Sequence, residues 1–346
     1  MSRQDLQIQR KPFAALTAAE RQDWSRMLNQ SDTSRWAFLS PTYAEAVNET
    51  LGPVEVLLCT RGDVLVGLMP LQRAIGWTGR LGLWEPAGRQ MTDYFGLLAL
   101  PGVALDWPAI LRAARIPCLY FTHLDESQRI HGLTGDNPRK GLRTRIHADG
   151  GVAHWEWLRN RDRKLVSDTE RRERKLAAEH GPLQFEMQSA NPMQDLECLI
   201  ALKSAQYRRT GHHSGPLLDK VNVRLLIRLL ESGDPNCLAR LSVLRCGGKW
   251  IAGHFGLQCG PILHYWFPVY DHRFASYSPG RILYRHILRS AQTEGVTCID
   301  RGEGETAAKR DFSTEEHFFY KGLVVYGLKG HGLHFIKRMQ WRLMCK

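Results

Sequence analysis

The sequence predicts an α/β protein of two domains, and three observations lead to this prediction. The chain has 346 residues, which exceeds the usual size of one compact domain and suits two domains of about 150 to 180 residues each. Segments with helical periodicity and segments with strand periodicity alternate along both halves. Each half also shows, in coarse form, antiparallel strands followed by a helix and a further strand. We therefore expect two domains, residues 1–158 and 159–346, each with a mixed, mainly antiparallel sheet flanked by helices.

The first half begins with helices and continues with strands. Two helical patterns precede two strand-like runs, which a turn at Arg61-Gly62-Asp63 connects. A third strand leads to a short helix capped by Asp106, and a fourth strand follows. The predicted elements, in chain order, are helices 18–29 and 41–48, strands 54–59, 64–71 and 95–100, helix 107–115 and strand 118–122. This order predicts a sheet covered by helices.

A charged helix connects the two predicted domains. The segment Arg159 to Glu179 is rich in charged side chains, favours helix formation and ends at Gly181-Pro182. We interpret it as a solvated bridging helix. Just before it, Trp155-Glu156-Trp157 has the alternation of a strand, which favours packing of both indoles in the core or between domains over a platform for a sugar.

The second half repeats the order of the first. Gly247-Gly248 and Cys259-Gly260-Pro261 are turn signals between three strand-like runs, so these runs should form an antiparallel meander. A helix then crosses over to a further strand. The predicted elements are helices 192–207 and 217–231, strands 239–245, 250–258 and 262–270, helix 279–294 and strand 296–300.

The start of the helix at Pro279 is a candidate anion site. Ser278 is placed as N-cap, Pro279 stands at the first helical position, and Gly280 would let a ligand approach the backbone. A helix N-terminus carries unpaired N–H groups and a partial positive charge, and Arg273 and Arg281 add full charges, which suits a pyrophosphate. An ordinary capped helix with solvated arginines is the alternative. The equivalent helix of the first half begins at Asp106, whose carboxylate should prevent phosphate binding there.

The composition is that of a folded, basic protein. Hydrophobic residues make up 43% of the chain and charged residues 24%, which excludes disordered, collagenous and coiled-coil chains. The 47 Lys and Arg residues against 35 Asp and Glu residues give a net charge of +12. This charge favours anionic partners, a class that includes nucleotide cofactors, nucleic acid, acidic polymers and membrane surfaces.

Cysteines and apolar segments bear on the cellular compartment. The 8 cysteines are spread singly and have no zinc-site spacing, so we expect reduced, buried thiols, no disulfide framework and no metal. The N-terminal residues lack the apolar segment of a signal peptide. The long uncharged run from Trp250 to Tyr270 is interrupted by Gly260-Pro261, unlike a membrane span. We expect a soluble, cytoplasmic protein without a transmembrane segment.

Several segments carry a resemblance to a known family. The strongest part, Gly253 to Lys309, contains a hydrophobic meander, Tyr270-Asp271, Tyr277-Ser278-Pro279-Gly280, Asp300-x-Gly302-x-Gly304 and Lys309. Weaker matches are Phe38-Leu39-Ser40-Pro41, Asp93-Tyr94-Phe95-Gly96 and Lys203 to Gly211. In their order and spacing these segments resemble the GNAT-fold acetyltransferases of the CelD/BcsL type, described as involved in cellulose biosynthesis and related to FemAB aminoacyltransferases. The resemblance covers most of the chain.

The resemblance implies a tandem GNAT fold whose second domain binds acetyl-CoA or another acyl-CoA as co-substrate. The pantetheine would run along the strand near Leu263 to Phe267, and the turn Tyr277 to Arg281 would take the pyrophosphate. The implied contacts are Leu263, Tyr265, Phe267, Arg273, Tyr277, Ser278, Pro279, Gly280 and Arg281. Two departures from the family stand out. Ser-Pro-Gly leaves one glycine where the commonest GNAT loop has several, and Ala308 precedes Lys309 where the family often has Tyr.

The chemistry implied is direct attack of an amine or hydroxyl on a thioester, which requires a base and polarisation of the thioester carbonyl. Asp300, at a strand end beside Gly302 and Gly304, is the first candidate for the base or for a substrate anchor, with Glu303 and Glu305 as alternatives. Lys309 resembles the lysine of the FemAB Phe-Lys motif and would polarise a carbonyl or hold an anionic part of the substrate. A solvated loop with a surface lysine is the alternative interpretation.

Further residues are candidates for the acceptor substrate. From the matched segments, Lys203 and Tyr207 in the second domain and Asp93 and Tyr94 in the first would be the substrate contacts. His212-His213, in a Gly- and Ser-containing loop, could act as general base, although adjacent loop histidines are commonly only solvated. The tail from Lys329 to Lys346 is basic and amphipathic, which fits a closing helix, with peripheral membrane or partner contact as the alternative.

These expectations lead to one preferred function and two alternatives. The preferred function is an acyl-CoA-dependent acyltransferase that modifies an amine or hydroxyl of a sugar or polysaccharide precursor. Its partners would be a small-molecule or glycan acceptor and the polysaccharide synthesis machinery, and not nucleic acid. The first alternative is a FemAB-like transferase that takes an aminoacyl group from tRNA, for which the charge would provide phosphate contacts. The second is a catalytically inactive GNAT-fold binding module of a polysaccharide synthesis system.

Overall fold

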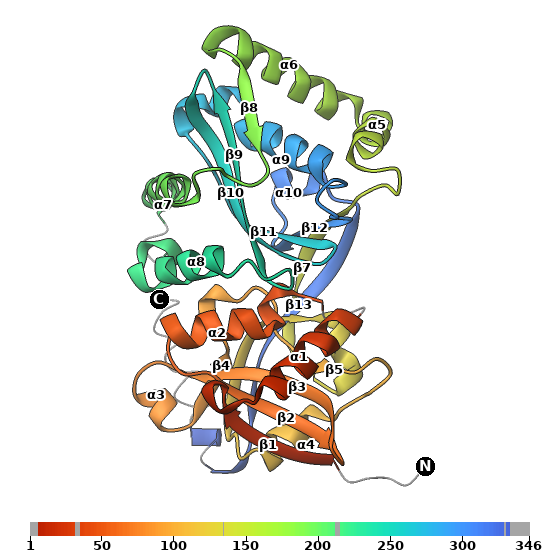
Figure 1. Ribbon diagram of the computed structural model, residues 1–346, viewed down its shortest axis with the longest axis vertical. Helices are drawn as coiled ribbons and strands as arrows, with labels where there is room; N and C mark the ends of the chain where they lie inside the picture. The colour runs from red at the N-terminus through yellow and green to blue at the C-terminus, as the bar shows by residue number, and fades with distance from the viewer. Residues whose placement is uncertain (1–5, 32–34, 134, 212–214, 329, 333–346) are drawn as a thin grey trace. The chain divides into compact units, whose positions relative to one another are not determined.

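The chain divides into two compact units. The structure, a computed structural model, describes residues 6–31, 35–133, 135–211, 215–328 and 330–332 (Figure 1). The first unit consists of residues 1–139 with 318–346, and the second of residues 140–317. The sequence predicts a single boundary between residues 158 and 159. The units divide instead after residue 139 and again after residue 317, so the first unit is built from two separated stretches of chain.

The first unit holds a sheet and helices among its described residues. Its labelled α-helices are α1 (Ala18–Gln30), α2 (Pro41–Thr50), α3 (Trp77–Arg80) and α4 (Trp107–Ala113), and residues 327–328 and 330–332 are helical as well. Its strands are β1 (Leu6–Pro12), β2 (Glu55–Arg61), β3 (Val64–Arg73), β4 (Leu83–Pro86), β5 (Leu98–Ala99), β6 (Cys118–Asp125), the start of β7 (Asp136–Arg145) and most of β13 (Glu315–Val325). The helices and strands predicted between residues 18 and 122 are present. The predicted strand 95–100 is reduced to the two residues of β5.

The sheet of the first unit is antiparallel apart from one pair of strands. Its order is β1-β2-β3-β4-β6-β13, and β5 pairs with β3. The exception is β4 with β6, which pair in parallel at Leu83–Cys118 and Trp84–Leu119. Strand β3 is buried from Leu65 to Gln72 and is therefore covered on both faces. Its sequence from Leu65 to Leu71 is a continuous apolar run.

The second unit contains the remaining elements. Its helices are α5 (Gly151–Arg161), α6 (Arg163–His180), α7 (Pro192–Arg209), α8 (Lys220–Ser232), α9 (Pro279–Ser290) and α10 (Ala307–Arg310). Its strands are most of β7, then β8 (Leu183–Glu186), β9 (Leu238–Cys246), β10 (Lys249–Cys259), β11 (Ile262–Tyr270) and β12 (Cys298–Glu303), in the sheet order β7-β12-β11-β10-β9-β8. The predicted meander is confirmed by the antiparallel pairs β9–β10 and β10–β11. Gly247 and Gly248, with φ of 53° and 75°, form its first turn.

Helix α9 is the central packing element of the second unit. Its apolar face, including Ile282, Leu283 and Ile287, is fully buried in the core that the sheet contributes to. Burial of each such side chain stabilises the fold by about 1.5 to 3 kcal/mol. On its other side, Arg285 forms ion pairs with Glu170 and Glu173 of α6. The helix is therefore held rigidly, and its first turn has a fixed position.

Two elements differ from the prediction. Trp155-Glu156-Trp157 lies in helix α5 and not in a strand, because a run of three residues is too short to separate the two periodicities. Trp155 is buried and donates from Nε1 to Glu170 at 3.0 Å, whereas Trp157 is partly exposed and lies under the Arg161 guanidinium. The expected single helix 159–179 is divided between α5 and α6, with Asp162 capping α6.

Candidate functional site

Strands β11 and β12 separate after a short parallel pairing. The pairing covers Ile262–His264 and Cys298–Asp300, whereas β11 runs on to Tyr270. The register between β10 and β11 shifts beside Gly256, because a β-bulge there places two residues of one strand opposite one residue of the other. The sheet of the second unit therefore opens at this point, and backbone polar groups of β11 become available to a ligand.

A cavity of about 520 Å³ lies at this opening. This volume is in the usual range for small-molecule and cofactor sites. Seven residues that the sequence predicts as site residues line it, namely Lys203, Tyr265, Ser278, Pro279, Gly280, Arg281 and Lys309. Other lining residues, which the sequence analysis does not predict, include Gln206, Tyr270, Tyr284, Arg301, Thr306 and Phe312. Helix α7, strand β11, the start of α9 and the segment after β12 thus meet in one cavity.

The first turn of α9 forms one wall of the cavity. Ser278 is the N-cap residue, as predicted, but its side chain makes no capping hydrogen bond, and its backbone is left-handed with φ of 54°. A β-carbon added at Gly280 would meet only the Tyr270 ring, at 3.9 Å. The helix start is therefore uncapped by the Ser278 hydroxyl and open at Gly280, which is the arrangement an anion needs to approach the backbone.

Two arginines near this helix start are differently placed. Arg281 lines the cavity, and its guanidinium donates to Asp311 at 2.7 Å. Arg273, in contrast, is 83% exposed in its side chain and pairs with Asp271. Only Arg281 of the two predicted arginines is part of the cavity wall.

Arg301 is a cavity residue that the sequence analysis does not identify. Its guanidinium lies 4.6 Å from the centre of the Tyr284 ring and 5.6 Å from that of Tyr265. It donates to the backbone carbonyls of Ala308 at 2.8 Å and Lys309 at 3.2 Å. Arg301 therefore connects the floor of the cavity to the short helix α10, which carries Lys309.

Lys309 lies where the sequence predicts a site residue. Its ammonium group donates to the Glu303 carbonyl at 2.7 Å, and its backbone N–H donates to the Thr306 side chain, which caps α10. The Glu303 backbone therefore orients Lys309, whereas Glu303 is not among the residues that line the cavity. A positive charge held at the cavity wall suits an anionic or polarised carbonyl oxygen.

Lys203 approaches the cavity from the opposite side, on helix α7. Its Nζ donates to the Pro268 carbonyl of β11 at 2.8 Å and lies 5.5 Å from the centre of the Tyr207 ring. Burial lowers the pKa of Lys203 to about 8. Near neutral pH a part of the lysine population is therefore an uncharged amine, which can accept a proton.

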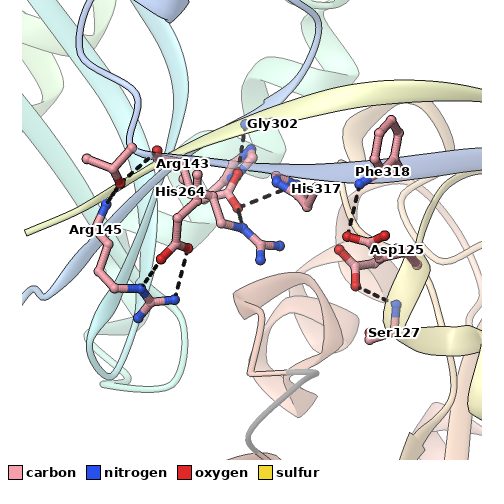
Figure 2. A network of polar contacts seen from close by, with 12 residues as sticks. Asp125, Ser127, Arg143, Arg145, His264, Gly302, His317 and Phe318 are labelled. Atoms are coloured by element: carbon pink, nitrogen blue, oxygen red, sulfur yellow. Dashed lines mark hydrogen bonds and ion pairs between the residues drawn. The ribbon is translucent and has the colours of Figure 1, made fainter.

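Asp300 lies at the point where β11 and β12 separate and is 1% exposed. Its carboxylate accepts from Arg143 Nε at 2.7 Å and from the Gly302 N–H at 2.7 Å, and it lies 3.3 Å from His264 Nδ1 (Figure 2). His317 Nε2 is 4.0 Å away. Burial alone would raise the pKa of Asp300, but the adjacent His264 ring and the charge of Arg143 outweigh it and hold the pKa far below its usual value.

This environment favours one of the two roles expected for Asp300. A carboxylate with so low a pKa is a very weak proton acceptor, so the position argues against a general base. It suits the other expected role, an anchor, because the carboxylate joins β7, β12 and β11 at the opening of the sheet.

Other predicted residues lie outside the cavity wall. Leu263 and Phe267 are buried, and the Tyr277 hydroxyl bonds to Glu179 and His180. Tyr207 contributes its ring beneath Lys203. In the first unit, Tyr94 is 1% exposed and stacks on Trp36 at 4.3 Å between ring centres, so it is a core residue there. His212 and His213 lie outside the described residues, as does most of the basic tail.

The described residues contain no group of three or more His, Cys, Asp or Glu side chains that could hold a metal ion. In the same part of the chain, no helix has the length and apolar character needed to cross a membrane.

Comparison with known proteins finds one matching family model and several solved structures of similar fold. Residues 163–310 match the family model described as an acetyltransferase (GNAT) domain. The fold is similar to the C-terminal domain of a protein from Agrobacterium fabrum assigned as a lysylphosphatidylglycerol synthetase, with 13% identity over 93% of this chain and 96% of that chain and a TM-score of 0.55. It is also similar to FemX, with 11% identity, 90% and 97% coverage and a TM-score of 0.55.

A further similar structure is a conserved protein of unknown function from Bacteroides thetaiotaomicron VPI-5482, with 13% identity, 92% and 100% coverage and a TM-score of 0.52. No curated protein matches the sequence significantly. At these identities the structural similarities show the fold and not the substrate.

Proposed function

We propose, from the premise that residues 163–310 form an acyltransferase domain of the GNAT type, that the protein transfers an acyl group from acyl-CoA to an amine or hydroxyl. The acceptor in this proposal is a sugar or polysaccharide precursor, in line with the motifs that resemble the CelD/BcsL type. The observation that carries the proposal is the single cavity that joins the opening between β11 and β12 to the first turn of α9.

The cavity suits the two ends of an acyl-CoA. The uncapped start of α9, with Gly280 open to a ligand and Arg281 beside it, offers N–H groups and positive charge to a pyrophosphate. Backbone groups of β11 beyond His264 can pair with the amides of pantetheine. The thioester would then lie where the strands separate, between Lys203 and Lys309, which both line the cavity.

The transfer step needs a proton acceptor and a positive charge near the thioester. The acceptor amine or hydroxyl attacks the thioester carbonyl carbon, the carbon–sulfur bond breaks, and CoA leaves as a thiolate. In the proposal Lys203, in its uncharged form, takes the proton from the attacking group and returns it to the thiolate. Lys309 stabilises the carbonyl oxygen as it becomes negative, and Arg301 holds α10 so that Lys309 keeps its place.

Calorimetric titration of the full chain with acetyl-CoA and longer acyl-CoAs tests this proposal. We expect micromolar affinity that depends weakly on salt, with a preferred acyl length that identifies the donor. Absence of acyl-CoA binding at two salt concentrations would contradict the proposal.

The similarity to FemX and the net charge of +12 favour a second candidate, transfer of an aminoacyl group from tRNA. Phosphate contacts from basic residues make tRNA binding steeply dependent on salt. Titration with bulk tRNA at the same two salt concentrations distinguishes the candidates. Binding of tRNA without binding of acyl-CoA would favour the aminoacyl transferase.

A further inference from the structure

A second cavity, of about 400 Å³, lies within the first unit and gathers four arginines. Its wall consists of Arg10, Arg73, Gly82, Trp84, Arg112, Arg115, Ile116, Pro117, Tyr326 and Gly327. These residues come from the ends of several elements, since Arg10 is in β1, Arg73 ends β3, Arg112 is in the last turn of α4, and Tyr326 follows β13. Arginines that are far apart in the sequence thus line the same cavity.

Two of these arginines are held in position by the protein. Arg10 pairs with Glu55 at 2.7 Å and donates to the Ala114 carbonyl at 3.2 Å. Arg73 lies 3.8 Å from the same carboxylate. Both guanidinium groups also lie over the buried Trp84 ring, 5.1 Å and 4.6 Å from its centre. Their planes are therefore oriented in advance, which lowers the entropic cost of binding a ligand.

The other two arginines have their charge available. Arg112 and Arg115 are exposed, and neither forms an ion pair with a described residue. Arg112 lies over the Tyr326 ring, 5.3 Å from its centre. Their position near the C-terminal end of α4 is favourable for cations, but it does not explain why Arg10 and Arg73 of other elements meet them there.

The charge balance of the cavity favours an anion. Four arginines line it, and Glu55, a carboxylate in direct contact with the cavity arginines, is shared between Arg10 and Arg73. Asp106 lies near Tyr326 and is the N-cap residue at the other end of α4, where its side chain makes no capping hydrogen bond. Like charges brought together in this way repel one another, and an anion bound among them reduces this repulsion.

We propose that this arginine cavity of the first unit binds a phosphate group carried by a small molecule or a lipid headgroup. The planar guanidinium fork matches phosphate oxygens in a bidentate way, and four forks from different directions suit a diphosphate or a phosphate with an attached polar group. The half-buried Tyr326 ring offers an apolar surface for the part that carries the phosphate. This inference does not depend on the acyl-CoA proposal, because the cavity belongs to the other unit.

The test uses the full chain with Gly280→Asp, so that phosphate binding at α9 does not contribute. Titration calorimetry with sodium pyrophosphate measures the free ligand, and co-sedimentation with phosphatidylglycerol vesicles, against phosphatidylcholine vesicles, measures the lipid form. The test variant adds Arg112→Gln with Arg115→Asn, which removes two charges and leaves the packed residues in place. Asparagine suits position 115, where φ is 56°. Arg26→Gln with Arg61→Gln, two exposed arginines of the first unit outside the cavity, is the control.

We expect the test variant to weaken binding of pyrophosphate or of phosphatidylglycerol vesicles at least tenfold, with the control close to the parent. The arm in which binding occurs identifies the free or the lipid-linked source. The proposal is overturned if neither probe binds, or if the test and control variants weaken binding equally. An unchanged melting temperature in both variants ensures that the comparison is between folded proteins.

Discussion

Asp300 and Lys203 show at the residue scale how burial assigns different roles to two ionisable side chains of one site. Asp300 is surrounded by donors, so its charge is stabilised and it does not readily take up a proton. Lys203 is half-buried beside a carbonyl and a ring, and no carboxylate of the described residues forms an ion pair with it, so its charge is destabilised. The lysine is therefore the better proton acceptor near neutral pH.

Substitution Lys203→Met tests this assignment. The folded-state pKa near 8 means that the uncharged amine, and with it the activity, increases as pH rises through about 8. We expect the substitution to lower kcat about 100-fold and to remove this inflection from the pH profile of kcat/KM. The affinity for acyl-CoA, measured by calorimetry, should change little.

Lys249→Met is the matched control, because Lys249 is exposed in the β9–β10 turn region. A Lys203→Met enzyme that keeps the wild-type pH profile would show that another group accepts the proton.

The sequence identifies much of the cavity at the residue scale, but not all of it. Ser278, Gly280, Arg281 and Lys309 are identified because a helix start and short motifs surround them. Arg301 is not, because its role depends on the side chains of Tyr265 and Tyr284, which only the folded chain brings to it. Arg301 occupies the first variable position of Asp300-x-Gly302-x-Gly304, so the motif itself does not single it out.

At the scale of the element, the first turn of α9 is predicted to bind the pyrophosphate of acyl-CoA. Gly280→Asp should raise the Kd for acyl-CoA at least 100-fold, because it places a carboxylate among the N–H groups of that turn. Gly280→Ala is the control, since a β-carbon there meets only the Tyr270 ring at 3.9 Å.

The control should also raise stability slightly, by less than the ~1 kcal/mol typical of helix interiors, because alanine is the better helix former. Chemical denaturation and calorimetry measure the two effects separately. Equal acyl-CoA affinity in the Asp and Ala variants would place the pyrophosphate elsewhere.

The strands differ in how well the sequence predicts them. The β9–β10–β11 meander is predicted because glycine turns separate three apolar runs. Strands β7 and β13 are not predicted, because β7 carries four charged residues within Asp136–Arg143 and β13 begins with Glu315 and Glu316. Their pairing is determined by strands distant in sequence, so local periodicity does not predict it.

At the scale of the whole molecule, buried histidines make stability depend on pH. Burial lowers the pKa of His254 to about 3, and the pKa of His154 and His317 to about 4, all in the second unit. An unfolded chain protonates histidine near pH 6.5. Between these values the unfolded chain binds more protons, so stability falls as pH is lowered from about 6.5 towards 4.

We expect His254→Phe to reduce the loss of stability between pH 7 and pH 5 by on the order of 1 to 2 kcal/mol. The His254 ring is fully buried and stacks on Tyr265 at 4.1 Å, so the flat phenyl ring suits the position. Denaturant titrations at the two pH values measure the difference. The exposed His272→Phe is the control, and an equal effect of both substitutions would contradict the prediction.

The divided first unit has a consequence for synthesis. Strand β13 pairs with β6 from Phe319 to Val325, although almost 200 residues of chain separate the two strands. During translation β6 therefore emerges with one edge unpaired, and it keeps that edge until the whole second unit has left the ribosome. An exposed strand edge is a template for pairing with other chains. The nascent protein should accordingly depend on chaperones during this interval, and a chain that stops before residue 315 should aggregate through its N-terminal part.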